Sequence, residues 1–201
     1  YTVTATNSAG STTANINITV NALAISYVGS PFSFANGATI SSKAVTNNGF
    51  ALSYGISPAL PTGLILNTST GLISGTPSVT SGSTAYTITA TANSGVTATT
   101  SINITVYQPI TISYTGSPFT YNVSSTITSL TPTVTNGPST GYSISPALSA
   151  GLSFNTTTGV ISGTPSAMQS LTSYTITATS ASNGSNTTSI LITVNQMLAP
   201  T

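Results

Sequence analysis

The chain alternates apolar and polar residues over short stretches, and this alternation predicts β-strands. In YTITATA (86–92) the tyrosine, the isoleucine and the alanines fall on one face, and the threonines fall on the other. SINITV (101–106) shows the same period of two. Strict alternation over about six residues is typical of half-buried strands, and threonine suits their wet side. Because TNNG, ANSG and ASNG supply turns and no segment carries a long 3.6-residue stripe, we expect an all-β fold.

Five phrases recur along the chain in a fixed order, which indicates tandem domains. The period is 85 to 88 residues, which is too long for a solenoid repeat and suits a small independent domain. The phrases are YTVTAT at Tyr1, returning as YTITAT at Tyr86 and Tyr174; NITV at Asn17 and Asn103, with LITV at Leu191; ISYVGSPF at Ile25 and ISYTGSPF at Ile112; SPAL at Ser57 and Ser145; and GLILNTSTGLISGTP at Gly63, with GLSFNTTTGVISGTP at Gly151.

The order of these phrases predicts the domain limits. Residues 23–107 and 108–195 each carry a full set, whereas 1–22 carry only the last strands of a preceding unit and 196–201 start the next unit or form a tail. Because the chain opens on the middle of a unit, we expect a fragment or a processed product. The joining segments ITVNALAISY and ITVYQPITISY leave almost no linker, so the domains should abut as a semi-rigid rod.

The opening segment carries apolar side chains that it cannot bury alone. A two-stranded hairpin is marginal in water, so residues 1–22 should pair with a preceding domain or with strands of another chain. The side chains concerned are Val3, Ile16, Ile18 and Val20.

The longest repeated phrase predicts a hairpin in each domain. Leu152 and Phe154 alternate as a short strand, NTTTG forms a turn in which Gly159 takes a positive φ, and VIS is the returning strand. The phrase that begins at Gly63 predicts the same hairpin. Several short strands with frequent turns in about 85 residues are typical of an antiparallel β-sandwich.

The run LPTGLILNTSTGLISGTP, followed by YTITATANSG and INITV, resembles the putative Ig domain family, which is related to cadherin-like and dystroglycan-type modules. The resemblance covers both full units and the opening half unit. It implies Ig-like sandwiches of the kind that recur in large bacterial and archaeal surface proteins, and it implies no enzymatic activity. The family often has Asp where this chain has Asn67 and Asn155, so calcium-stiffened linkers are not expected here.

Charge is almost absent, which excludes most catalytic chemistry. The 201 residues include no Asp, Glu, His or Cys, and Lys43 is the one charged side chain, whereas an ordinary domain carries about 25% charged residues. Acid–base and nucleophilic catalysis need such groups at a tuned pKa, so we expect no enzyme and no catalytic residue. Lys43 lies in ISSKAVT, without a nucleophile elbow or S-x-x-K spacing, and is interpreted as facing solvent.

The same composition excludes several classes of ligand. Calcium sites need carboxylates and zinc sites need Cys or His, so we expect no metal and no cofactor. A basic surface for nucleic acid is missing. The sequence contains no run of about 18 apolar residues, so we expect no membrane insertion of this segment.

Seven N-x-S/T sequons make covalent glycans on asparagine a candidate modification. Chance accounts for some of them, because the chain is rich in Asn, Ser and Thr. Two lie on the polar face of a final strand (Asn17 and Asn103), and two lie in the turn of the repeated hairpin (Asn67 and Asn155). The full set is Asn17, Asn67, Asn103, Asn122, Asn155, Asn183 and Asn186.

The nine tyrosines raise the question of carbohydrate binding, but their register favours the core. Tyr86 and Tyr174 lie on the inward face of their strands, and Tyr27 and Tyr114 hold equivalent places in ISY. Tyr107, at the joining segment, is expected to pack between units.

Together these patterns favour a structural protein at the cell surface. We expect a segment of an extracellular filament or stalk whose partners are neighbouring copies or repeats of the same protein, in a homopolymer or a long array. The alternative is an adhesin module that binds a glycan or a protein on another cell. Near-identical units without a pocket-like insertion favour the stalk, because an adhesin needs one divergent unit.

Overall fold

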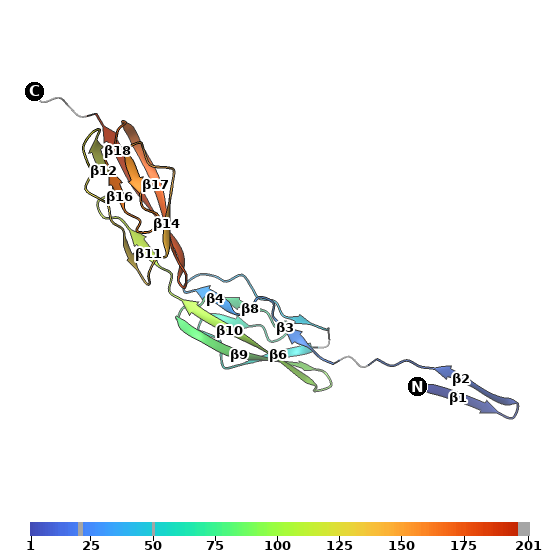
Figure 1. The fold of residues 1–201 in the computed structure, drawn as a ribbon. Coiled ribbons are helices and arrows are strands. Elements are labelled where there is room, and N and C mark those ends of the chain that lie inside the picture. Colours follow the sequence, from blue (N-terminus) through green and yellow to red (C-terminus); the bar gives the residue numbers. More distant parts are fainter. Residues whose placement is uncertain (20–21, 50, 197–201) are drawn as a thin grey trace, which may run out of the picture.

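The computed structural model describes residues 1–19, 22–49 and 51–196, and this part of the chain contains strands and no helix. Figure 1 shows a β-hairpin, then a first sandwich, then a second. Val20 and, apart from Gln196, the segment 196–201 lie outside the described residues. The strands are β1 (Thr2–Asn7), β2 (Gly10–Asn15), β3 (Ile25–Ser26), β4 (Phe32–Ala35), β5 (Thr46–Asn47), β6 (Ala51–Ser57), β7 (Leu64–Leu66), β8 (Ile73–Gly75), β9 (Ser81–Ala92), β10 (Thr97–Tyr107), β11 (Thr111–Ser113), β12 (Phe119–Asn122), β13 (Thr133–Thr135), β14 (Gly141–Ser145), β15 (Leu152–Phe154), β16 (Ile161–Gly163), β17 (Gln169–Ser180) and β18 (Gly184–Asn195).

The first two strands form a hairpin whose residues are all exposed. β1 pairs antiparallel with β2, with Thr2 opposite Asn15. Val3 and Ile18 are 52% and 63% exposed. The strand predicted at YTVTAT is present as β1, whereas residues 17–19 of the predicted final strand lie beyond the end of β2. In this single chain the apolar side chains of Val3, Ile16 and Ile18 are uncovered.

The first sandwich packs a four-stranded sheet against two short strand pairs. The sheet has the order β4-β10-β9-β6, and the other layer holds β3–β5 and β7–β8. A bridge between Lys43 and Ile73 extends that second layer. The alternation read from the sequence puts the isoleucines of β9 and β10 inside. The buried core consists of Tyr27, Phe32, Phe34, Tyr54, Leu64, Ile73, Tyr86, Ile88, Ala90, Ile102, Ile104 and Val106.

The second sandwich repeats this arrangement around its own core. Its sheet has the order β12-β18-β17-β14, with β11–β13 and β15–β16 opposite and a bridge between Leu130 and Ile161. Burial of the tyrosines at 27, 86, 114 and 174 confirms their predicted core role. The core here consists of Ile110, Ile112, Tyr114, Ile127, Ile161, Tyr174, Ile176, Ala178, Ile190, Ile192 and Val194.

Each four-stranded sheet contains one parallel pair. β4 runs parallel to β10, with Phe32 opposite Ile104, and β12 runs parallel to β18, with Phe119 opposite Ile192. The other strand pairs are antiparallel. The predicted class of tandem all-β sandwiches is confirmed, and the large sheets are mixed. Alternation shows which face of a strand is buried, but it carries no information on the direction of the neighbouring strand.

The repeated phrase folds into a hairpin that needs glycine at two positions. Gly63 has a φ of +93°, and a Cβ there would lie 2.0 Å from the main-chain oxygen of Thr76. Gly75 has a φ of +124°, and its Cβ would lie 2.1 Å from the oxygen of Gly63. Gly151 and Gly163 repeat both features in the second sandwich. The two glycines let two backbone segments approach more closely than any side chain would allow.

A buried tyrosine hydroxyl ties the turn of this hairpin to the core. The hydroxyl of Tyr27 donates to the carbonyl of Gly71, and that of Tyr114 donates to the carbonyl of Gly159. Burial of the hydroxyl, with a smaller contribution from Tyr54, raises the pKa of Tyr27 from 10.0 to about 12. Burial raises the pKa of Tyr114 in the same way.

Candidate functional site at the domain junction

Three surface hollows in the described part of the chain lack the side chains that acid–base chemistry needs. The first, of about 360 Å³, lies at the turn between β1 and β2, and the second, of about 300 Å³, is lined by residues 24–26 and 46–48. The third, of about 310 Å³, is lined by Val123, residues 166–168 and Gln196. Neither Lys43 nor a tyrosine lines any of the three. Within the described residues, no group of three or more His, Cys, Asp or Glu side chains is present to hold a metal ion. The described chain also has no helix that is long and apolar enough to cross a membrane.

Several long-range side-chain hydrogen bonds instead surround the joining segment 107–110, which links β10 to β11. On the side of the first sandwich, the backbone N–H of Asn36 donates to the carbonyl of Tyr107 at 2.8 Å. The Asn36 side-chain Nδ2 donates to Oε1 of Gln108 at 2.9 Å. Both groups of Asn36, just after β4, therefore hold the start of the joining segment.

Three asparagines of the second sandwich hold the same segment from the other side. Asn183, in the turn between β17 and β18, donates through Nδ2 to the carbonyl of Gln108 at 2.8 Å. Asn186 donates to the carbonyl of Ile110 at 2.8 Å, and Asn136 donates to that of Pro109 at 3.1 Å. Three consecutive carbonyls thus accept amide hydrogen bonds, and we call this set of asparagines, 36, 136, 183 and 186, the amide clamp.

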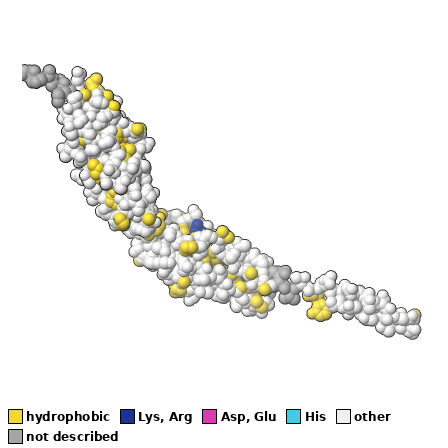
Figure 2. Space-filling model, in the orientation of Figure 1, with side chains coloured by type: hydrophobic (Ala, Val, Ile, Leu, Met, Phe, Trp, Pro, Cys, Tyr) yellow, Lys and Arg dark blue, Asp and Glu magenta, His cyan; other side chains and the backbone are white. Residues whose placement is uncertain are grey.

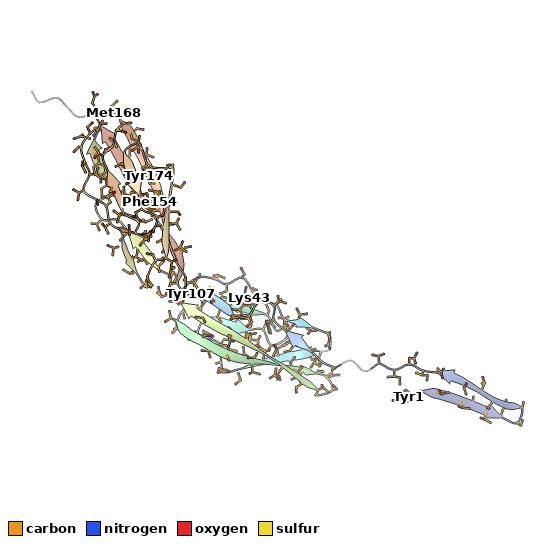
Figure 3. All side chains as sticks on the ribbon, viewed as in Figure 1. Tyr1, Lys43, Tyr107, Phe154, Met168 and Tyr174 are labelled. Carbon is orange, nitrogen blue, oxygen red and sulfur yellow. The ribbon has the colours of Figure 1, made fainter. Side chains whose placement is uncertain are left out.

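Tyr107 packs into the clamp, as its position in the sequence predicted. A Cβ added to Gly184 would lie 2.9 Å from the Tyr107 hydroxyl oxygen, so the ring of one domain rests on a glycine of the next. Figure 3 shows Tyr107 where the two sandwiches meet. The contact combines an aromatic surface with hydrogen bonds, and it contains no charged group.

The junction before the first sandwich provides a natural control. Asn48 holds the place of Asn136 and donates to the carbonyl of Ala22. The places of Asn183 and Asn186 are taken by Gly95 and Ala98, which have no side-chain donor. One of the clamp contacts is therefore common to both repeats, whereas the contacts from the hairpin turn belong to the second sandwich.

The seven predicted glycosylation residues fall into two groups. Asn183 and Asn186 are half-buried, and the nitrogen that would carry a sugar is engaged in the clamp. Asn17 does not lie on a strand as predicted, because β2 ends at Asn15. The exposed members are Asn17, Asn67, Asn103, Asn122 and Asn155.

Lys43 is half-buried, which corrects the interpretation of it as a solvent-facing residue. Its backbone exchanges hydrogen bonds of 2.8 and 3.0 Å with Ile73. This pairing carries its Nζ over the core aromatics, 5.3 Å from the ring centroid of Phe32 and 6.0 Å from that of Phe34. An ammonium over an aromatic face contributes about 0.5–1 kcal/mol at such partly exposed sites, so Lys43 covers the core aromatics.

The amide clamp is only weakly encoded in local sequence motifs. Asn183 and Asn186 stood out only as sequons, and nothing singled out Asn36 or Gln108. The available signal was the unusual amide content on both sides of a very short linker, in TVYQPIT and SASNGSN. The contacts form because the fold brings the β17–β18 turn beside residues 107–110.

Comparison with solved structures finds 337 matching chains. The extracellular domains 3–5 of Drosophila OTK match with a TM-score of 0.54 and 13% identity, over 87% of this chain and 62% of that one. Fibronectin(III)-like modules of Clostridium thermocellum CbhA match with a TM-score of 0.45 and 10% identity, over 86% and 95% of the two chains. The insect immune protein hemolin matches with a TM-score of 0.42 and 15% identity, over 98% and 56%. A search among curated proteins gave no match.

The family comparison is the more specific finding. The model of the Putative Ig domain matches the chain twice, over residues 18–107 and 104–195. Tandem Ig-like domains are typical of extracellular adhesion or structural proteins, and domains of this type are generally non-catalytic. Since the two matches together cover most of the 201 residues, the chain belongs to the Putative Ig domain family.

Proposed function

We propose that this chain is a stiff spacer segment of an extracellular filament or stalk, built from tandem Ig-like domains and associated with neighbouring copies or repeats of the same protein. The amide clamp carries this proposal. A spacer must transmit position from one domain to the next, and the joining segment is held by side chains of both sandwiches. A flexible tether would need no such contacts.

The surface supports a role in which chains lie side by side. Figure 2 shows a largely uncharged face with a single dark-blue spot, which belongs to Lys43. Neighbouring chains of this kind meet hydroxyl and amide groups with no like-charge repulsion to separate them, and near-zero net charge favours association. Contacts without exposed ion pairs should also resist high salt.

The clamp is tested by a double variant, Asn183→Ala with Asn186→Ala. Small-angle scattering should show a shorter mean length and a broader spread of domain orientations than in the wild type, because each lost amide hydrogen bond contributes about 1 kcal/mol to the junction. The melting temperature of the domains should change little, since neither side chain belongs to a core.

Asn103→Ala is the matched control, because Asn103 is an exposed strand residue away from the clamp. Its scattering curve should equal that of the wild type. A wild-type chain that already samples a broad range of orientations would contradict the spacer role.

Electron microscopy of native material distinguishes the two candidate functions. Regular fibres that persist in high salt support the filament. Dispersed monomers that bind a defined glycan or receptor on another cell would replace it with the adhesin.

A further inference from the structure

The exposed asparagine of the repeated turn is held in the same geometry in both domains. Oδ1 of Asn67 accepts the backbone N–H groups of Ser69 and Thr70, both at 3.0 Å. Oδ1 of Asn155 accepts the equivalent two N–H groups, both at 2.9 Å. Each carboxamide is therefore fixed through its oxygen alone.

The nitrogen of each fixed carboxamide is left available. Within the described part of the chain, Nδ2 of Asn67 and Nδ2 of Asn155 take part in none of the hydrogen bonds, and both residues are exposed. At Asn183 and Asn186 the arrangement is the reverse, because Nδ2 is the atom that donates to a carbonyl of the joining segment. The asparagines therefore fall into two groups. In the turns Oδ1 is engaged and Nδ2 is available, whereas in the clamp Nδ2 itself is engaged.

The turn sequons are also the pair that recurs at one position in both sandwiches. Asn103 is replaced by Leu191 in the second domain, and Asn122 is replaced by Ala35 in the first. The triplets at the turns, Asn-Thr-Ser and Asn-Thr-Thr, both satisfy the acceptor pattern. A modification at the turn would therefore repeat once per domain along the chain.

We infer that Asn67 and Asn155 are glycan acceptor sites, and that Asn183 and Asn186 are kept unmodified as parts of the clamp. In the reaction, Nδ2 forms a bond to the anomeric carbon of a sugar donated by a lipid diphosphate. The bond from that carbon to the diphosphate oxygen breaks, the diphosphate leaves with the electron pair, and a proton of Nδ2 passes to a base of the transferase. The product keeps Oδ1, so both turn hydrogen bonds survive.

This inference rests on the extracellular location in the proposed function, but not on filament formation. The full chain is secreted from a yeast that glycosylates asparagine, and the folded product is digested and freed of glycan in heavy-oxygen water. Mass spectrometry of the peptides then reads the occupancy of each asparagine. We expect high occupancy at Asn67 and Asn155 and at least a tenfold lower occupancy at Asn183 and Asn186.

Two variants separate acceptor chemistry from folding. Ser69→Ala keeps the backbone N–H that Asn67 uses and removes only the sequon hydroxyl, so the chain should fold and lose one glycan. Ser185→Ala removes the sequon of Asn183 and should leave the glycan mass unchanged. Unmodified Asn67 and Asn155, or an equal occupancy at the clamp asparagines, overturns the assignment. Single chains in electron micrographs would reject the filament and leave this result untouched.

Discussion

The two sandwiches have almost the same interior and different ends. Ile73, Ile88 and Ile104 are completely buried in the first, and Ile161, Ile176 and Ile192 are equally buried in the second. At the ends, Asn36 corresponds to Val123, Gly95 to Asn183 and Ala98 to Asn186. The repeat therefore constrains what each domain needs to fold, whereas each junction is specified by residues that differ between the units.

One difference reaches the edge of the core itself. Lys43 and Leu130 occupy equivalent positions, and both bridge to the isoleucine that opens the second strand of the repeated hairpin. The first domain covers Phe32 and Phe34 with a lysine, and both rings are buried there. The second has leucine at this position, packed against its core, and Phe119 and Tyr121, the counterparts of Phe32 and Phe34, are half-buried. The backbone bridge is thus retained in both domains, while the side chain at this position differs.

Substitution of the close-approach glycines should have the largest effect. Gly63→Ala places a Cβ against the carbonyl of Thr76 at a positive φ, so we expect the first domain to lose at least about 3 kcal/mol of stability. Gly151→Ala should do the same to the second. Peptide-resolved hydrogen exchange reads the two domains separately, and only the altered domain should lose protection.

Gly82→Ala is the control for this comparison. Gly82 lies exposed on β9, and a Cβ there meets nothing within 4 Å. Its stability should stay within about 0.5 kcal/mol of the wild type. Loss of protection in both domains after a single glycine change would show that the two sandwiches do not fold independently.

Alkali should lower the stability of the fold, whereas acid should leave it unchanged. The folded pKa of Tyr27 is about 12, compared with 10.0 in its ordinary state. Because the folded chain holds this proton more tightly, stability is complete below about pH 10 and falls as the pH rises toward 12, by roughly 3 kcal/mol for this residue. With no Asp, Glu or His, the melting temperature should be nearly flat between about pH 3 and 7.

Substitution of a single tyrosine should show which domain causes the alkaline loss of stability. Tyr27→Phe should remove the alkaline loss from the first sandwich and leave that of the second, where burial also raises the pKa of Tyr114. At neutral pH the same change should cost about 1 kcal/mol, because the hydrogen bond to Gly71 is lost. Thermal melts across the pH range test this, and a steep acid transition in unglycosylated chain would contradict it.

Exchange of the two edge residues should have the smallest effect. Lys43→Leu should change the stability by less than about 1 kcal/mol, since the lost cation–π contact is offset by burial of leucine. Leu130→Lys should cost about 1 kcal/mol more than Lys43→Leu, because Leu130 packs partly buried against the second core and this apolar contact would be lost. Chemical denaturation of both variants measures the difference, and equal costs would show that the two positions are interchangeable.

Residues with strict alternation were predictable from the sequence. Tyr86, Ile88 and Ala90 are buried as their register required, since a strand has only two faces and one of them must meet the core. The hairpin of the repeated phrase was also predictable, because Gly159 does adopt a positive φ. The local sequence pattern was sufficient to predict those features that depend only on residues adjacent along the chain.

Features that depend on distant neighbours were not predictable. The parallel pairing of β4 with β10 joins segments far apart in sequence, and Lys43 faces aromatics that only the folded layers bring beneath it. Asn183 had the same sequence signature as Asn155, yet one donates its amide to a linker and the other accepts backbone N–H groups. The sequon motif describes three residues and contains nothing about the surroundings of the amide.

The parallel strand pairs also determine how a pulled chain would carry tension. β4 lies near the entry of the first sandwich and β10 at its exit, and they run in the same direction. A pull on both ends drives the two strands past each other, so that their hydrogen bonds are loaded together in shear. In the opening hairpin the two ends leave from the same side, beside the pair formed by Tyr1 and Ile16, and a pull would open the hydrogen bonds one after another. Within one chain, the sandwiches are therefore built to resist stretching, and the isolated hairpin is the part that would yield first.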